Sequence, residues 1–264
     1  MPDWLVVIIL GIIEGITEFL PVSSTGHLLL AEQALNLHQS DLFNIVIQCG
    51  AVLAVLPLFP ERLQQFLFRW RETATRDYLL KIVAAFFITG LGGVLLEKMH
   101  FKLPDAPLPI ALALLVGGVL FVLVERWLRG RPLGDEVTWT IAVAVAGAQL
   151  VAAIFPGTSR SGATILFALA LGLSRPAATE FSFLVGIPTM LAAGGLKIFK
   201  ALHHPPAGAP PENWPLVLLG GIVAAGVSFL VVKWLLRYVR SHTFTVFGWY
   251  RIAVAIAIFA LLAK

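Results

Sequence analysis

Hydrophobic residues run through most of this chain in long stretches, and short polar or proline-containing stretches separate them. The pattern predicts helical segments at 3–20, 23–36, 41–59, 77–100, 107–129, 137–154, 158–172, 175–201, 214–240 and 244–263. A helix needs about 20 residues to cross the hydrocarbon core of a bilayer. Six segments are predicted as full spans, at 41–59, 77–100, 107–129, 175–201, 214–240 and 244–263.

Two of the other segments, 23–36 and 158–172, are too short to cross a membrane. Each follows a proline, Pro21 or Pro156, and begins with small hydroxyl residues. Proline ends the preceding helix, and hydroxyl side chains cap the next one. We therefore expect each proline to mark the turn of a helical hairpin that enters the membrane and returns to the same side.

The two expected hairpins resemble each other in sequence. Pro21-Val-Ser-Ser24 aligns with Pro156-Gly-Thr-Ser159 at an offset of 135 positions. Two similar halves that enter from opposite faces are typical of an inverted repeat. The fold class predicted is therefore all-α, a polytopic membrane protein with six transmembrane helices and two re-entrant helical hairpins in an inverted-topology repeat.

The domain organisation predicted is one integral membrane domain over 1–264. Its first repeat covers about 1–105 and its second about 106–264. Four prolines mark an exposed loop within the second repeat, at Pro205, Pro206, Pro210 and Pro211.

Composition supports a membrane location and excludes several other classes. The chain is 58% hydrophobic and 13% charged, whereas soluble domains carry roughly 25% charged residues. The net charge of +4 does not indicate nucleic-acid binding, since basic residues collect at the cytoplasmic ends of membrane helices. The single cysteine, Cys49, excludes an intramolecular disulfide.

The distribution of basic residues predicts the orientation. Under the six-span topology, one side holds twelve of them: Arg62, Arg69, Arg71, Arg76, Lys81, Arg126, Arg129, Arg131, Arg175, Lys233, Arg237 and Arg240. The other side holds five: Lys98, Lys102, Lys197, Lys200 and Lys264. Since the richer side faces the cytoplasm, the first hairpin is expected to enter from outside and the second from inside.

Two carboxylates, Glu14 and Glu18, lie four residues apart and so share one face of the first hairpin helix. Ionisable groups at membrane depth are costly and usually mark a functional site. Neighbouring carboxylates repel unless they bind a cation, share a proton or face Arg or His. The alternative is that one of them lies at the end of the helix, at the membrane interface.

The segment Pro21-Val-Ser-Ser-Thr-Gly-His27 starts the next helix with three hydroxyl residues. The free N–H groups and the dipole of a helix N-terminus favour an anion. Ser24 and His27 are three residues apart, so the imidazole is expected to approach the hydroxyl and activate it as a nucleophile. Phosphate contacts are expected from Ser23, Thr25 and Gly26. The alternative for the hydroxyl residues is helix capping.

The segment Pro156-Gly-Thr-Ser-Arg-Ser-Gly162 offers an arginine at another helix start. Arg160 is expected to bind a phosphate through paired hydrogen bonds. The other phosphate contacts predicted here are Gly157, Thr158, Ser159, Ser161, Gly162 and Thr164. The alternative, which is compatible with phosphate binding, is that Arg160 pairs with Glu14 or Glu18.

Together these residues predict a phosphate site with a nucleophile, a base and a divalent cation. Glu14 and Glu18 are the candidate metal ligands, and carboxylates favour Mg²⁺ or Ca²⁺ over zinc. Gln48, a polar residue in an apolar span, is expected to face the same cavity. The sequence contains no Walker-type loop and no cluster of His and Cys.

These residues closely resemble the undecaprenyl-diphosphatase family, the bacitracin-resistance type of bacterial membrane phosphatase. The resemblance lies in Glu14-Gly-Ile-Thr-Glu-Phe-Leu-Pro-Val-Ser-Ser-Thr-Gly-His27, in Pro156-Gly-Thr-Ser-Arg-Ser-Gly-Ala-Thr164 and in Ser174-Arg-Pro-Ala-Ala-Thr-Glu-Phe-Ser-Phe183. It implies hydrolysis of undecaprenyl diphosphate in the bacterial inner membrane, the step that recycles the lipid carrier for peptidoglycan. It also implies that Glu14, Glu18, Ser24, His27 and Arg160 form the functional set.

The mechanism expected is attack of Ser24 on the terminal phosphorus while His27 removes its proton. Arg160 neutralises the phosphates, and Glu18 with Glu14 holds a metal or handles protons. The sequence leaves open His27 as the nucleophile, a transporter or flippase of the lipid carrier as the alternative function, and a homodimer as the assembly. The partners expected are a polyprenyl diphosphate and membrane lipids.

Overall fold

The computed structural model describes residues 1–35, 37, 39–99, 101, 106–203 and 212–262, and these are helical with no β-strand among them. The helices are α1 (Asp3–Thr17), α2 (Ser24–Leu35), α3 (Asp41–Val55), the 3₁₀ turn η1 (Leu56–Leu58), α4 (Pro60–Phe68), α5 (Thr73–Lys98), α6 (Pro107–Trp127), α7 (Trp139–Ile154), α8 (Arg160–Ala170), α9 (Arg175–His203), α10 (Trp214–Tyr238) and α11 (Thr245–Leu262). The predicted proline loop at Pro205, Pro206, Pro210 and Pro211 lies outside the described residues, as do Lys102, Lys264 and the predicted helix ends at 36, 100 and 263.

Six helices are long and apolar enough to cross a bilayer, within the ranges that the structure describes. They are α3 with η1, α5, α6, α9, α10 and α11. Large apolar side chains on them face outward, and Leu91 and Ile222 are each 70% exposed. Such surfaces suit lipid rather than water, so the six predicted spans are confirmed and the chain is a multi-pass membrane protein.

The short helix α4 was not predicted from the apolar pattern of the sequence. It begins at Pro60, and a proline is well tolerated in the first turn of a helix. The helix contains polar residues, among them Arg62, so it does not form a long apolar segment. The next helix begins at Thr73 rather than at the predicted 77. The connection after η1 is therefore more helical than expected.

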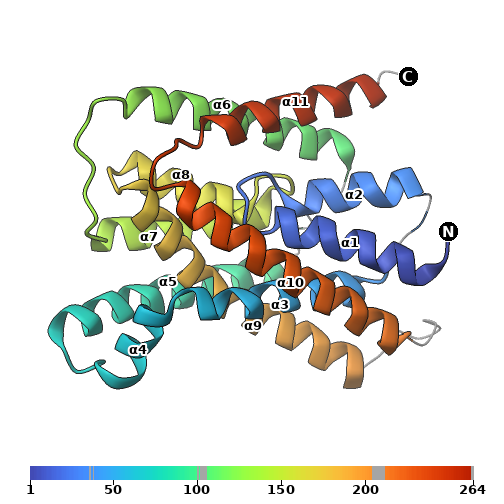
Figure 1. The fold of residues 1–264 in the computed structure, drawn as a ribbon, viewed down its shortest axis with the longest axis horizontal. Helices are drawn as coiled ribbons and strands as arrows, with labels where there is room; N and C mark the ends of the chain where they lie inside the picture. The colour runs from blue at the N-terminus through green and yellow to red at the C-terminus, as the bar shows by residue number, and fades with distance from the viewer. Residues whose placement is uncertain (36, 38, 100, 102–105, 204–211, 263–264) are drawn as a thin grey trace.

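The helices pack as pairs around a central region (Figure 1). The short helices α1 and α2 lie against each other, and so do α7 and α8. Their two turns meet near the middle of the molecule (Figure 1), where Ser161 Oγ lies 3.2 Å from the carbonyl oxygen of Glu18 and 3.1 Å from that of Leu20. Polar segments 140 or so residues apart in the sequence are therefore neighbours in space.

Glycines allow the closest helix contacts. A Cβ atom on Gly50 of α3 would lie 2.6 Å from the carbonyl oxygen of Gly221 in α10. One on Gly11 of α1 would lie 2.7 Å from the carbonyl oxygen of Gly220. Small residues at helix interfaces let backbones approach and increase van der Waals contact in a membrane, where the hydrophobic effect adds little. These contacts hold α1 and α3 against α10.

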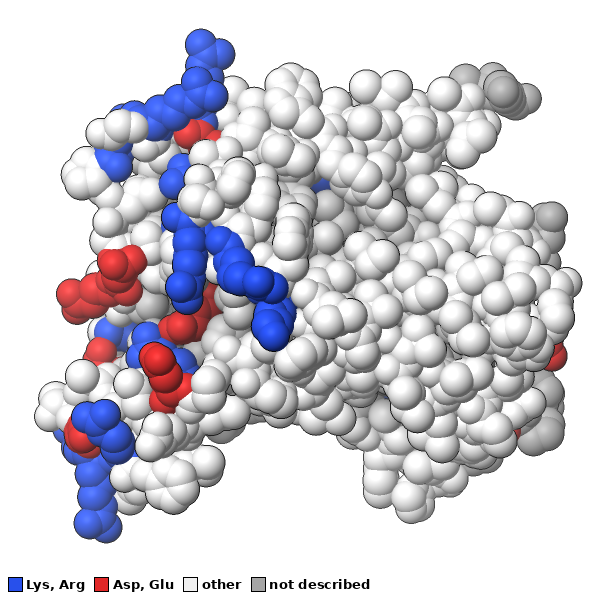
Figure 2. Space-filling view, in the orientation of Figure 1, with Lys and Arg blue, Asp and Glu red and all other residues white. Residues whose placement is uncertain are grey.

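Charged residues gather at one end of the molecule. Figure 2 shows Lys and Arg side chains at the end that carries α4 and the α6–α7 connection. Several of them face aromatic rings, including Arg62 over Tyr78 and Arg131 over Trp127. The opposite end, on the face shown, carries few charges (Figure 2). This asymmetry matches the basic side counted from the sequence.

Candidate active site

The helices α2 and α8 start in the same way. Ser23, before α2, has a φ of 76°, and Ser159, before α8, has a φ of 67°. Each side chain accepts a hydrogen bond from the backbone N–H three residues on, at Gly26 (3.4 Å) and Gly162 (3.1 Å). Positive φ is rare for serine and backbone strain of this kind collects at functional sites. The two helix starts are therefore equivalent structures.

This equivalence changes the alignment of the two hairpins by one residue. The capping serines lie 136 positions apart, whereas the sequence comparison used an offset of 135. One residue, Val22, separates the first proline from its cap, but Gly157 and Thr158 separate the second. As a result, the residue that corresponds to Ser24 is Arg160 rather than Ser159.

The carboxylate of Glu18 joins the two helix starts. Ser24 Oγ donates a hydrogen bond to Glu18 Oε2 at 2.6 Å, and Arg160 Nη2 donates to Glu18 Oε1 at 2.9 Å. Glu18 is buried, and Gln48 Nε2 lies 3.5 Å from its Oε2. The predicted pairing of Arg160 with one of the two glutamates is therefore confirmed, and its partner is Glu18.

The imidazole of His27 has other partners than the Ser24 hydroxyl. Its Nδ1 lies 2.7 Å from the carbonyl oxygen of Ser23, and its Nε2 lies 2.8 Å from the hydroxyl of Tyr250 in α11. Since a carbonyl only accepts, Nδ1 carries the hydrogen, and Nε2 of the neutral ring accepts from Tyr250. The two rings stack with 6° between their planes. The expected approach of His27 to Ser24 is not seen, because the ring turns toward α11.

Glu14 lies one helical turn before Glu18 and is 1% exposed. Neither of its carboxylate oxygens has a hydrogen-bond donor among the described residues, and its carboxyl group adjoins that of Glu18. An unpaired buried carboxylate is costly unless a proton or a cation accompanies it. The observed surroundings of Glu14 therefore fit a bound divalent cation or a shared proton.

Arg160 has a second nitrogen, Nη1, that is buried without a hydrogen-bond partner in the part of the chain described. The guanidinium group packs against Gly186 in α9, where an added Cβ would lie 2.8 Å from Cζ and overlap Nη1. Nothing in the sequence pattern distinguishes Gly186 from the other glycines. It matters because it leaves the space that this guanidinium occupies.

The predicted phosphate contacts divide into two groups. A cavity of about 250 Å³ is lined by Ser23, Ser24, Thr25, Gly157, Ser159, Arg160, Gln48 and Glu18. Ser161 and Thr164 are buried and lie within hydrogen-bond distance of backbone carbonyl oxygens. Thr158 and Gly162 line a separate apolar groove beside α6, and Gly26 lies in the cap of α2. Within the second group, Ser161 joins the two turns, and Thr164 bonds to carbonyl oxygens of its own helix.

Arg251 in α11 is a further residue at this site that the sequence analysis left unassigned. It is fully buried, and its guanidinium lies 3.1 Å from the carbonyl oxygen of Pro21 and 3.0 Å from that of Thr158. It also contacts the carbonyl oxygens of Gly157 in the second turn and of Ala113 and Leu114 in α6. The sequence signal that could have identified Arg251 is the presence of an arginine inside an apolar segment, since charged residues at membrane depth usually have specific partners.

The fold and the site define a class, that of multi-pass membrane proteins with a polar site built from two opposed helix starts. The family model described as bacitracin resistance protein BacA matches residues 7–257, and the chain belongs to this family. The resemblance read from the motifs is therefore confirmed.

The chain is also similar to curated proteins along almost its whole length. It is 48% identical to the undecaprenyl-diphosphatase of Rhizobium etli, over 99% of this chain and 98% of that protein. It is 49% identical to the undecaprenyl-diphosphatase of Rhizobium leguminosarum, with the same coverage. With the one from Xanthomonas campestris it shares 48% identity, over 98% of this chain and 97% of that protein.

Proposed function

We propose that the chain hydrolyses undecaprenyl diphosphate to undecaprenyl phosphate and inorganic phosphate in the inner membrane of a bacterium. Relatives that are nearly half identical along the whole chain carry the name undecaprenyl-diphosphatase. The observation that carries the proposal is the 2.6 Å hydrogen bond from Ser24 Oγ to Glu18, beside Arg160. A hydroxyl that donates a hydrogen bond to a carboxylate is an activated nucleophile, because the carboxylate can accept its proton. Arginine binds phosphate.

In the first step Ser24 Oγ attacks the terminal phosphorus of the diphosphate. The Oγ–P bond forms, the bond from phosphorus to the bridging oxygen breaks, and undecaprenyl phosphate leaves. The proton of the hydroxyl passes to Glu18, which accepts its hydrogen bond in the resting site. This assignment gives Glu18 the role of general base that the sequence analysis gave to His27.

In the second step water attacks the phosphoserine. Glu18 first returns the proton it holds to the departing lipid phosphate, and it then takes a proton from the water. The P–Oγ bond breaks, Glu18 passes the proton taken from water to Ser24 Oγ, and inorganic phosphate leaves. Positioned acid–base groups of this kind contribute about 10²–10⁴ in rate.

Charge on the phosphates is balanced by groups that already point into the site. The guanidinium of Arg160 lines the cavity, and the starts of α2 and α8 offer free backbone N–H groups. Preorganised donors of this kind usually supply the largest share of catalysis. Glu14, whose carboxylate oxygens are unpaired in the described residues, would hold the Mg²⁺ or Ca²⁺ expected from the sequence, and the cation would supply further charge neutralisation when bound.

The membrane arrangement we propose is an inverted repeat over one domain, residues 1–264, with halves at about 1–105 and 106–264. Each half contributes one re-entrant hairpin, α1–α2 from outside and α7–α8 from inside. The equal capping of α2 and α8 supports the repeat. The basic end of the molecule, taken as cytoplasmic, supports the orientation (Figure 2).

Phosphate release by the purified protein in detergent tests the proposed function, because detergent leaves no sealed compartments for transport. We expect release from undecaprenyl diphosphate by the unaltered chain and a loss of at least about 10³-fold in Ser24→Ala. Ser241→Ala is the matched control, since Ser241 is exposed in the turn that follows α10. A purified chain that releases no phosphate would refute the proposal.

Trapping the phosphorylated protein decides between Ser24 and His27 as the nucleophile. A phosphoserine survives acid and is lost in strong base, whereas a phosphohistidine behaves in the opposite way. We expect an acid-stable phosphoryl group on the peptide that contains Ser24. An acid-labile group on His27 would show that Ser24 has another role.

A further inference from the structure

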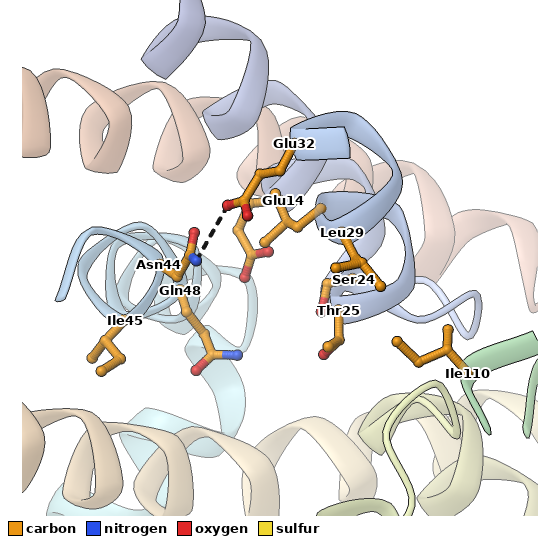
Figure 3. Close-up of a pocket in the computed structure, with 10 residues that line it drawn as sticks. Glu14, Ser24, Thr25, Leu29, Glu32, Asn44, Ile45, Gln48 and Ile110 are labelled. Carbon is orange, nitrogen blue, oxygen red and sulfur yellow. Dashed lines mark hydrogen bonds between the residues drawn. The ribbon is translucent and has the colours of Figure 1, made fainter. Parts of the chain in front are cut away.

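A second cavity adjoins the first and is lined by oxygen-bearing side chains from three helices. Its volume is about 220 Å³. Glu14 of α1, Glu32 of α2 and Asn44 of α3 point into it from different sides (Figure 3). It shares Ser24 and Gln48 with the cavity that contains Glu18. A ligand bound here would therefore lie next to the nucleophile.

Three oxygens of side chains that line this cavity have no hydrogen-bond donor among the described residues. Both carboxylate oxygens of Glu14 and the amide oxygen of Asn44 are buried without a hydrogen-bond partner in the described residues. Glu32 is 8% exposed, and its Oε1 accepts one long hydrogen bond, 3.4 Å, from Asn44 Nδ2 (Figure 3). Buried polar atoms in proteins nearly always have partners. The unpaired oxygens of α1 and α3, beside the carboxylate of Glu32 in α2, therefore call for a donor or a cation between them.

The charge around the two cavities is unbalanced. Among the described residues that line them, the carboxylates are Glu14, Glu18 and Glu32, whereas Arg160 is the single cationic group. Arg251 lies behind the turns with its nitrogens on backbone carbonyls. A diphosphate would bring further negative charge to the same place. A cation is the simplest group that would make this site attractive to phosphate.

Glu18 is poorly placed to be the main ligand of such a cation. One of its oxygens accepts from Ser24 and the other from Arg160. Within the described ranges no group of three or more His, Cys, Asp and Glu side chains is arranged to hold a metal, so a cation here would need the amide oxygen of Asn44 in addition to carboxylates. Such all-oxygen sets suit Mg²⁺ and Ca²⁺ and do not suit zinc.

We propose that Glu14, Glu32 and Asn44 bind a divalent cation of the Mg²⁺ or Ca²⁺ type beside the nucleophile. Glu14 supplies unpaired carboxylate oxygens, Glu32 a second charge, and Asn44 a neutral oxygen; water and phosphate fill the remaining positions. The phosphate ligand rests on the proposed phosphatase function. The three protein ligands do not depend on it, since they are residues of this chain. It replaces the pair Glu14 and Glu18 as the ligand set expected from the sequence.

Mn²⁺ binding to the purified, chelator-treated protein tests the site without turnover. Mn²⁺ takes the ligands of Mg²⁺, and the loss of the resonance signal of free hydrated Mn²⁺ measures binding. We expect one saturable site per chain, displaced by Mg²⁺ or Ca²⁺. Glu32→Gln should weaken Mn²⁺ binding by at least about tenfold, since one ligand charge is lost. Glu136→Gln, which removes an exposed carboxylate, should leave binding unchanged.

Asn44→Asp separates the proposal from misfolding, because a misfolded protein would bind Mn²⁺ more weakly and not more tightly. It adds a carboxylate of the same shape and should tighten Mn²⁺ binding by about tenfold, because affinity rises with ligand charge. Wild-type affinity in both Glu32→Gln and Asn44→Asp, or a wild-type protein without saturable binding, overturns the proposal. Binding with the expected pattern but no phosphate release would refute the phosphatase and leave the cation site standing. Phosphate release without Mn²⁺ binding would refute the cation site and leave the phosphatase standing.

Discussion

Gly186 gives the sharpest test of how the second hairpin contributes to the site. The glycine lies in α9 against the guanidinium of Arg160, and a methyl group there would lie 2.8 Å from Cζ and overlap Nη1. The guanidinium is the free end of a flexible side chain, whereas α9 is fixed by its packing. We therefore expect Gly186→Ala to displace Arg160 and leave the helix in place.

The expected loss follows from what Arg160 contacts. Displacement breaks its 2.9 Å ion pair with Glu18 and moves the guanidinium from its place in the cavity lining. Removal of one preorganised donor from a transition state costs about 10²–10³ in kcat. Alanine is favoured over glycine in a helix by about 1 kcal/mol, but leaving the buried Glu18 carboxylate without its partner costs about 3–5 kcal/mol. The variant should therefore unfold at a lower temperature and be nearly inactive.

The assay is phosphate release from undecaprenyl diphosphate, with thermal unfolding measured in the same detergent. Gly195→Ala is the matched control, since it lies in the same helix and a Cβ there meets nothing within 4 Å. The double variant Gly186→Ala with Arg160→Ala should be no slower than Arg160→Ala alone, because the glycine acts through the arginine. Normal kcat in Gly186→Ala, or additive losses in the double variant, would refute this reasoning.

Three further outcomes follow from the structure. Arg251→Met should lower both the midpoint of thermal unfolding and the activity. Each backbone carbonyl left without its donor costs about 1–3 kcal/mol. An unchanged unfolding midpoint would show that Arg251 does not join the turns. Gly50→Ala should destabilise the protein, since its Cβ would meet the backbone of α10, whereas Gly90→Ala, with open space around it, should not; equal unfolding midpoints would contradict this. Tyr250→Phe removes the hydrogen bond to His27 and should reduce kcat by less than tenfold if His27 is not the base; a loss as large as that of Ser24→Ala would restore His27 to that role.

The sequence predicted the spans well because apolar length is a local property. Each of the six spanning helices could be located from its own residues, whereas α4 was missed because its polar residues lack that signal. The predicted alignment of the two hairpin sequences was wrong by one position, since the capping serines lie 136 and not 135 residues apart. Four-residue motifs do not reveal that the second turn contains an extra residue before its cap.

The residue types of the site could be predicted, but their pairing could not. Glu18, Ser24 and Arg160 were expected to be functional, and the structure brings them together. The position of His27 depended on Tyr250, which lies 223 residues further along the chain. Gly186 and Arg251 likewise act through contacts between distant helices, and a local pattern contains no information on which helices meet.

The shared carboxylate of Glu18 has a consequence for how the protein is made. Its partner Ser24 is synthesised almost immediately after it, but Arg160 leaves the ribosome 142 residues later. A nascent chain that ends after α5 contains the hydroxyl and the carboxylate but not the guanidinium. Activity should therefore arise only when the later hairpin docks, and two separately expressed halves should regain activity only on assembly.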